Sequence, residues 1–200
     1  MVILIGGSSH TGKTTLAQHL ITEYAYPSFS IDHLKMGLIR SGQTSLTPES
    51  SDNALTSYLW PIVSEMVKTA IENEQNLIAE GCYIPYDWSK SFTQPYLDQI
   101  CYVCLIFSER YIRDHWTDIL RFASVTEKRG DDSRPDQEKL IRENAEALEA
   151  CCRLGNNYIL IDDSYTDTLL TGIRKLCGLP KSKVAQPQIS STDVRGRATF

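Results

Sequence analysis

The chain has 200 residues, of which 42% are hydrophobic and 22% charged, and its formal net charge is −5. This length suits one domain with a sizeable core, and the negative charge gives no support for nucleic-acid binding, which usually requires a basic face. We expect neither a membrane span nor a signal peptide, because no apolar run reaches about 18 residues and no basic segment precedes the short N-terminal apolar stretch. These features predict a cytoplasmic protein.

The first predicted element is a buried strand from Val2 to Ile5, and a glycine-rich turn follows it directly. Residues Gly7 to Thr14, named here the phosphate loop, fit the pattern G-x-x-x-x-G-K-[ST] at every fixed position. Apolar residues then recur at helical spacing from Leu16 to Ile21, which predicts a helix after the turn. In this context the backbone N–H groups of the turn and the helix N-terminus attract phosphate oxygens. The sequence therefore predicts a binding site for a nucleoside triphosphate.

Individual residues of the phosphate loop have distinct expected roles. Lys13 should reach the β- and γ-phosphates, and the Thr14 hydroxyl should ligate Mg²⁺. His10 is bulky for such a loop and either contacts the ligand or faces solvent; we favour solvent. The residues expected to line the nucleotide site are Gly7, Ser8, Ser9, His10, Thr11, Gly12, Lys13, Thr14 and Thr15.

Further apolar strands alternate with helical segments along the chain. They are predicted at Ser28 to Ile31, Asn76 to Ala79, Ile100 to Phe107 and Asn157 to Ile161. This alternation predicts an α/β fold in which a parallel sheet carries helices on both faces. Ligands of such sheets bind beyond the carboxyl ends of the strands, so the residues that follow each strand are the candidates for function.

A carboxylate follows each of the second and third predicted strands. Asp32 should lie across the cleft from the γ-phosphate, where it can orient an attacking hydroxyl or accept its proton; alternatively it caps the next helix. Glu80 can hold an Mg²⁺-bound water or a substrate hydroxyl, or it can pair locally, and Gly81 permits close approach of backbone or ligand. Arg40, near the end of the helix after Asp32, either binds an anionic substrate or lies on the surface.

Arginines are frequent after the fourth strand. Planar cations stabilise the charge that develops on a transferring phosphoryl group, and Arg110 and Arg113 occupy neighbouring positions on one helix. We assign these two a catalytic role; the alternative is a solvated helix whose arginines pair with nearby acids. The arginines of this segment are Arg110, Arg113, Arg121, Arg129 and Arg134.

Several other residues receive structural interpretations. The six cysteines are predicted to be free thiols, because Cys101 and Cys104 face opposite sides of a strand and no second pair has zinc-ligand spacing. Asp162 and Asp163 are interpreted as a turn and a helix cap, and the aromatic residues Tyr83, Tyr86 and Trp88 as core or rim. A late helix is expected to bury Ile141, Ala145, Leu148 and Cys152.

Together these residues resemble the small-molecule kinases of the phosphate-loop class. The run Gly6-Gly7-Ser8-Ser9 is similar to the form found in chloramphenicol phosphotransferase-like and 2-phosphoglycerate kinase-like proteins. Asp32 falls where that group and the zeta-toxin kinases keep a catalytic aspartate, and the arginine-bearing segment resembles the lid of adenylate kinase-like enzymes. The resemblance implies a three-layer P-loop NTPase fold, a five-stranded sheet in the order 2-3-1-4-5, and ATP and Mg²⁺ as cosubstrates. The chain differs from many phosphate-loop ATPases because Ser108 and Glu109, rather than an aspartate, follow the fourth strand.

The predicted function is ATP- and Mg²⁺-dependent transfer of the γ-phosphoryl group to a hydroxyl or phosphate of a small molecule. The alternatives are a zeta-toxin-like nucleotide-sugar kinase and a non-catalytic, nucleotide-dependent switch that engages a partner. We expect a monomer or homodimer with a small-molecule acceptor and no nucleic-acid or membrane partner. Residues 1–180 are predicted to form the kinase domain, with a lid at about 110–135, and residues 181–200 a polar tail.

Overall fold

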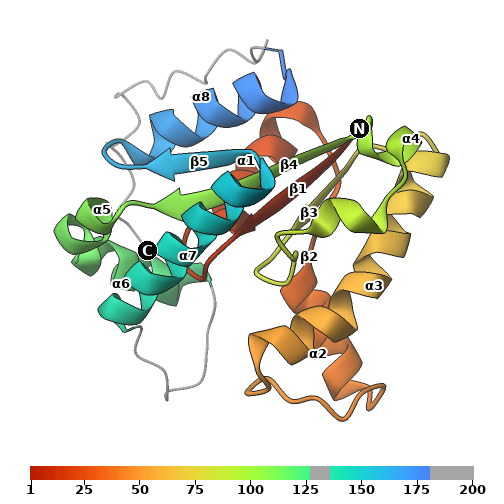
Figure 1. Ribbon diagram of the computed structural model, residues 1–200, viewed down its shortest axis with the longest axis horizontal. Helices are drawn as coiled ribbons and strands as arrows, with labels where there is room; N and C mark the ends of the chain where they lie inside the picture. Colours follow the sequence, from red (N-terminus) through yellow and green to blue (C-terminus); the bar gives the residue numbers. More distant parts are fainter. Residues whose placement is uncertain (127–135, 181–200) are drawn as a thin grey trace, which may run out of the picture.

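The computed structural model describes residues 1–126 and 136–180. Its centre is a five-stranded parallel sheet with strand order β2-β3-β1-β4-β5 (Figure 1). This confirms both the parallel sheet and the strand order predicted above. Arg129 and Arg134 of the predicted lid, and the whole predicted tail, lie outside the described residues. The strands are β1 (Val2–Gly7), β2 (Ser28–Ser30), β3 (Leu77–Glu80), β4 (Ile100–Phe107) and β5 (Tyr158–Ile161).

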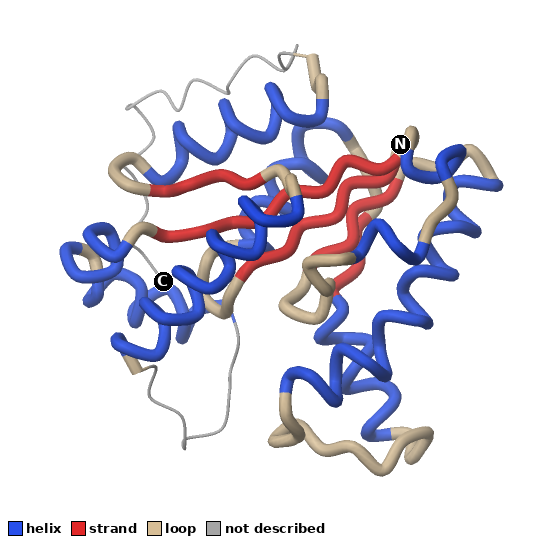
Figure 2. Tube along the Cα trace, in the orientation of Figure 1, coloured by secondary structure: helices blue, strands red, loops and turns tan. Residues whose placement is uncertain are grey.

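Helices cover both faces of the sheet, as the alternation of elements predicted (Figure 2). One hydrophobic cluster joins α3 and α7 to one face, and a second joins α1 and α8 to the other. None of the described helices has the length and apolar character needed to cross a bilayer. The helices are α1 (Lys13–Tyr24), α2 (Ile31–Arg40), α3 (Asp52–Glu72), the 3₁₀ helix η1 (Trp88–Ser91), α4 (Gln94–Leu97), α5 (Glu109–Asp114), α6 (Trp116–Thr126), α7 (Gln137–Leu154) and α8 (Tyr165–Cys177).

The strand register brings the candidate residues to one edge of the sheet. The first four residues of β1 after Met1 are fully buried, as expected for a central strand covered on both faces. Ile5 on β1 and Ser30 on β2 both lie opposite Glu80 on β3. The carboxyl ends of β2 and β3 therefore meet beside the start of the phosphate loop.

The boundary between β2 and α2 differs from the prediction. The strand ends at Ser30 and the helix begins at Ile31, so Asp32 lies in the first helical turn rather than at the strand end. Ser30, not Asp32, occupies the N-cap position. A carboxylate in the first turn of a helix interacts favourably with the helix dipole.

The predicted buried face of α7 is wrong for two of its four residues, while Ile141 and Leu148 are partly buried against the core as predicted. Ala145 and Cys152 are exposed, and the buried stripe is rotated onto neighbouring positions. The reason is Asn144, which is 1% exposed and whose side-chain oxygen accepts a hydrogen bond of 2.8 Å from the backbone N–H of Phe107 at the end of β4. A buried polar side chain that satisfies a strand terminus is not visible in a hydrophobic pattern. The buried residues of α7 are Leu140, Asn144, Ala147, Ala150 and Cys151.

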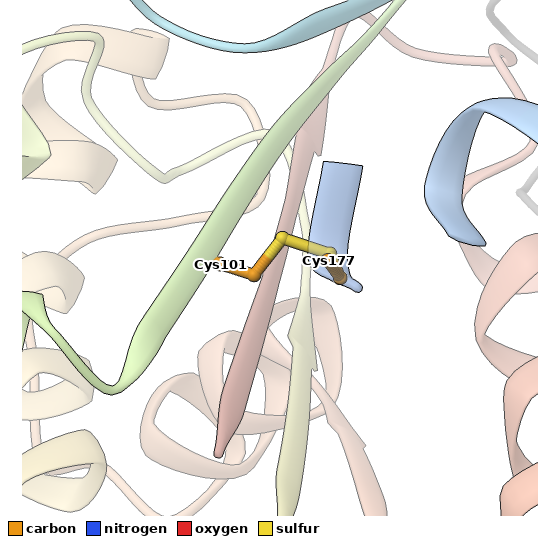
Figure 3. The surroundings of a disulfide bond; sticks show 2 residues. All are labelled: Cys101 and Cys177. Atoms are coloured by element: carbon orange, nitrogen blue, oxygen red, sulfur yellow. A yellow bond between two sulfur atoms is a disulfide. The ribbon is translucent and has the colours of Figure 1, made fainter. Parts of the chain in front are cut away.

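A disulfide joins Cys101, near the start of β4, to Cys177, the last residue of α8, with a Cα–Cα distance of 5.5 Å (Figure 3). The prediction of six free thiols is therefore wrong for this pair. Cys101 and Cys104 do face opposite sides of the sheet, as predicted, since they belong to different hydrophobic clusters. The partner was missed because Cys177 is 76 residues away in the sequence. The free cysteines are Cys82, Cys104, Cys151 and Cys152.

Candidate active site

The phosphate loop connects β1 to α1, and two of its glycines are required by the backbone. Gly7 has a φ of 130°, and a Cβ there would lie 2.5 Å from the carbonyl oxygen of Leu105. Gly12 has a φ of 83°, and a Cβ there would collide with the hydroxyl of Tyr165. No L-residue with a side chain fits these positions without displacing its neighbours. The two glycines thus allow the tight turn that the sequence pattern predicted.

Side chains of the loop hydrogen-bond to its own backbone. The Thr11 hydroxyl and the Lys13 ammonium each donate to the carbonyl oxygen of Ser8, both at 2.8 Å. The hydroxyl of Tyr165, from the start of α8, donates to the carbonyl of Thr11 at 3.3 Å. His10 adopts a left-handed φ of 65°. These contacts hold the loop curled around its backbone amides, which is the arrangement that binds phosphate oxygens.

Lys13 places a buried positive charge at this loop. Its residue is only 6% exposed. Burial lowers the pKa of Lys13, but interactions with Cys82, Glu80 and Asp32 outweigh that effect, so the pKa is raised above its ordinary value. The side chain therefore carries its charge at neutral pH. A buried cation among loop amides is the electrostatic environment that a triphosphate requires.

Glu80 lies beneath the predicted metal ligand. It is 3% exposed, and one of its carboxylate oxygens accepts a hydrogen bond of 3.2 Å from the Thr14 hydroxyl. Burial raises the pKa of Glu80, and hydrogen bonds from Ser30 and Thr14 together with the charge of Lys13 only partly oppose this. Glu80 thereby orients the Thr14 oxygen. A hydroxyl oxygen fixed at the mouth of a phosphate-binding loop fits Mg²⁺, which prefers oxygen ligands and shares them with substrate phosphates.

Gly81 determines how closely α2 approaches the sheet. A Cβ at Gly81 would lie 2.8 Å from the Cβ of Ile31, so only glycine permits this packing. The Gly81 N–H donates to the carbonyl of Ile5 at 3.1 Å, which keeps it in line with the sheet. Because α2 lies so close, Asp32 comes within electrostatic reach of both Lys13 and Glu80.

Asp32 itself is held by a neighbour that the sequence analysis did not select. The Lys35 ammonium donates to a carboxylate oxygen of Asp32 at 2.7 Å and to the Tyr83 hydroxyl at 2.9 Å. Lys35 also lies 4.9 Å from the centre of the Tyr83 ring. The signal was present in the sequence, since residues three apart are neighbours on a helix. Cys82 was also missed; its sulfur lies 3.7 Å from the Ser9 hydroxyl.

The predicted catalytic arginines are engaged by carboxylates. Arg110 donates to Asp162 at 2.6 Å and to Asp163 at 2.8 Å. Arg113 donates to Glu109 at 2.9 Å and to Glu138 at 2.8 Å. Contact of these arginines with phosphate stays a prediction.

Two predictions at the helix ends have different outcomes. Asp162 does not cap α8, whose N-cap residue is Ser164; it accepts instead from Arg110 and from the Ser108 hydroxyl. Arg40 is the last residue of α2 and is exposed, so its role toward an anionic substrate stays a prediction.

Comparison with known proteins is informative for the fold. No protein-family model matches the chain, and no curated protein sequence matches it. Among solved structures, the chain is similar to a gluconokinase from Sinorhizobium meliloti 1021, with a TM-score of 0.51 and 13% identity over 89% of this chain and 92% of that one. The chain has the fold of the P-loop small-molecule kinases.

Two further solved structures agree on this P-loop kinase fold. A shikimate kinase from Bacteroides thetaiotaomicron matches with a TM-score of 0.51 and 16% identity, covering 90% of this chain and 99% of that one. A sugar kinase from Janibacter sp. HTCC2649 matches with a TM-score of 0.51 and 15% identity, covering 89% of this chain and 94% of that one. At these identities the likeness concerns the fold, and the activity has to be argued from the site.

Proposed function

We propose that this protein is an ATP- and Mg²⁺-dependent kinase that transfers the γ-phosphoryl group to a hydroxyl or phosphate of a small molecule. The observation that carries the proposal is that the Asp32 carboxylate, in the first turn of α2, lies close enough to the buried Lys13 ammonium of the phosphate loop to help raise its pKa. The P-loop kinase fold supports it, since the similar structures are of a gluconokinase, a sugar kinase and a shikimate kinase.

The phosphate loop is the proposed binding site for the triphosphate. The residues from Gly7 to Thr15 would contact the phosphates through backbone N–H groups, with Lys13 between the β- and γ-phosphates. Thr14, oriented by Glu80, would hold Mg²⁺. When bound, the cation neutralises charge on the β- and γ-phosphate oxygens. The residues fit this ligand because Gly7 and Gly12 allow the tight turn of the loop and Lys13 keeps its charge while buried.

Asp32 is the proposed general base. The acceptor O–H bond breaks and its proton goes to the Asp32 carboxylate, while the acceptor oxygen forms a bond to the γ-phosphorus. The bond between that phosphorus and the β–γ bridging oxygen breaks, and its electron pair leaves with ADP. Such general base catalysis contributes roughly 10²- to 10⁴-fold to the rate.

Arg110 and Arg113 are the proposed source of further positive charge. Both guanidiniums are about half exposed, at 56% and 46%, so their carboxylate pairs are weak and can be exchanged for phosphate. Arg40 is proposed to meet an anionic group of the acceptor. Residues 1–180 are proposed to form one catalytic domain, in which closure over the site would exclude water.

A panel of acceptors tests this function. ATP consumption would be measured with D-gluconate, shikimate, chloramphenicol, 2-phosphoglycerate and a nucleotide sugar, and the products identified by mass spectrometry. Lys13→Ala should abolish ATP binding, whereas Asp32→Asn should bind ATP normally and transfer about 100-fold more slowly. Nucleotide-dependent capture of a protein partner with no transfer to any acceptor would instead support the switch, and preference for the nucleotide sugar would support the zeta-toxin-like alternative.

A further inference from the structure

We propose that Lys35 is a positioning residue that, together with Tyr83, fixes the Asp32 carboxylate in the orientation that receives the acceptor. The inference rests on the proposed function, because it concerns the same site. It assigns a role to a lysine and a tyrosine that the phosphate-loop pattern does not include.

The geometry joins three side chains from two elements. Asp32 and Lys35 lie three residues apart on α2, and Tyr83 follows β3. The Lys35 ammonium lies 2.7 Å from Oδ1 of Asp32 and 2.9 Å from the Tyr83 hydroxyl. Lys35 thus bridges the helix to the sheet edge. The hydrogen bond uses Oδ1, and Oδ2 is the oxygen that we propose for the acceptor hydroxyl.

Burial distinguishes this ion pair from an ordinary surface pair. The side chains of Lys35 and Asp32 are 12% and 22% exposed, and Tyr83 is 6% exposed. Burial lowers the pKa of Lys35, but its hydrogen bonds to Asp32 and Tyr83 outweigh this and raise the pKa above its ordinary value. A lysine gains little stability from an exposed pair, whereas a partly buried pair with a third hydrogen bond has a defined geometry.

The charges around Asp32 explain why its carboxylate needs a partner that fixes its orientation. The positive charge of Lys13 in the phosphate loop attracts the Asp32 carboxylate, and the carboxylate of Glu80 on β3 repels it. Without Lys35, the Asp32 side chain could turn toward Lys13 and occupy the space intended for phosphate. In this proposal the direct ion pair with Lys35 holds the carboxylate in the orientation that receives the acceptor. A displacement of about 1 Å can slow a reaction about 100-fold.

The chain offers a matched control in Lys68. It pairs with Glu65 at 2.6 Å and at the same three-residue spacing, and its ammonium lies 5.9 Å from the centre of the Phe92 ring. The Lys68 side chain is 24% exposed but Glu65 is 70% exposed, so this pair has the same chemistry with its carboxylate open to solvent. Lys68→Met therefore measures what the loss of a helical lysine pair does outside the site.

The first test compares ATP binding and ATP turnover in Lys35→Met, Lys35→Arg, Tyr83→Phe and Lys68→Met. Turnover is measured with water as acceptor and with D-gluconate and shikimate as probes. Lys35→Met should lower kcat by about 10- to 100-fold without changing the Kd for ATP. Lys35→Arg should recover part of the loss and Tyr83→Phe should lose less than Lys35→Met. Equal kcat values in Lys35→Met and Lys68→Met would overturn the inference.

The second test reads the pair directly and does not need an acceptor. The ¹³Cε signal of Lys35, identified by its absence in Lys35→Arg, would be titrated in the wild-type protein and in Asp32→Asn. The pKa of Lys35 should fall in Asp32→Asn, because burial remains while the hydrogen-bonded charge is lost. An unchanged titration would overturn the inference even if the enzyme is inactive.

Failure of the proposed function has a different signature. A protein that does not bind ATP, or whose ATP binding survives Lys13→Ala, would contradict the kinase assignment itself. In that case the lysine titration alone would decide whether Lys35 holds Asp32. A different result would refute only the role of Lys35. In that result the protein binds ATP normally and its turnover depends on Lys13, but Lys35→Met does not change the turnover.

Discussion

The disulfide between Cys101 and Cys177 gives a quantitative prediction about stability. It ties the start of β4 to the last turn of α8. Without this crosslink the unfolded chain can adopt more conformations, which lowers the stability of the folded state. We expect reduction, or the substitution Cys177→Ser, to lower the midpoint of thermal unfolding. A hollow of about 480 Å³ borders both cysteines.

The size of the effect follows from the separation of the two cysteines. Closing a loop of 76 residues removes unfolded-state entropy worth about 4.5 kcal/mol at 25 °C in the chain-entropy model. Measured disulfides commonly contribute about 2–4 kcal/mol. For a domain of this size, 1 kcal/mol moves the unfolding midpoint by about 2–4 °C. The expected decrease is therefore about 5–15 °C.

The assay is thermal unfolding followed by circular dichroism, with and without reductant. Reduction should lower the unfolding midpoint of the wild-type protein. Cys177→Ser should have the lower midpoint without reductant, and reductant should not change it further. Cys152→Ser is the control, since Cys152 is a free and exposed cysteine. Alkylation of the unfolded, unreduced chain should modify four cysteines, namely those that are free in the structure. Modification of all six, or equal midpoints for wild type and Cys177→Ser, would refute the reasoning.

Three further predictions concern the site. Gly12→Ala should destabilise the protein by at least about 1 kcal/mol and weaken ATP binding, because the new methyl group is forced into a left-handed backbone and against Tyr165; urea denaturation and ATP titration measure both effects. ATP and Mg²⁺ should slow alkylation of Cys82, which lies beside the phosphate loop, but not that of the exposed Cys152; mass spectrometry counts the adducts. In the wild-type protein, ionisation of Glu80 should lower the free energy of unfolding as the pH rises, and Glu80→Gln should abolish this decrease. Urea denaturation without nucleotide or Mg²⁺ measures it.

The sign of the pH effect follows from the direction of the pKa shift. Burial raises the pKa of Glu80 in the folded protein above the ordinary value of 4.5. The folded state then binds the proton more tightly, so this group's contribution is fully present below pH 4.5 and is lost as the pH rises through the higher folded pKa. A parallel decline in wild type and Glu80→Gln would contradict this reasoning.

Matched variants define the other two outcomes. Gly42 has a positive φ of 72°, but no neighbouring atom lies within 4 Å of the position that a methyl group would take there, so Gly42→Ala isolates the backbone contribution. If Gly12→Ala were no worse than Gly42→Ala, the contact with Tyr165 would carry no weight. If nucleotide protected Cys82 and Cys152 equally, or neither, the triphosphate would not lie against the phosphate loop.

The sequence predicted the parts of the site that have local patterns. The phosphate loop could be predicted because its pattern lies within eight consecutive residues, Gly7 to Thr14. Asp32 and Glu80 could be selected because each comes directly after a predicted apolar strand. The strand order came from the family resemblance rather than from the residues, because alternation of strands and helices fixes a parallel sheet but not the order of its strands.

The features that were missed depend on contacts between distant residues. The Cys101–Cys177 disulfide joins a strand to a helix 76 residues away. The buried face of α7 is displaced by Asn144, whose reason for burial is a backbone N–H on β4. The bridge from Lys35 to Tyr83 spans 48 residues and exists only because Gly81 lets α2 approach the sheet. None of these leaves a periodic signal in the chain.

The most direct test of the central claim is the rate of phosphoryl transfer in a single turnover. The protein would be preloaded with γ-labelled ATP and Mg²⁺ and mixed with a saturating acceptor from the panel. We predict that Asp32→Asn retains the ATP affinity of the wild-type protein and transfers the label about 100-fold more slowly. Transfer at the wild-type rate in Asp32→Asn would contradict the account, because the carboxylate would then play no part in preparing the acceptor.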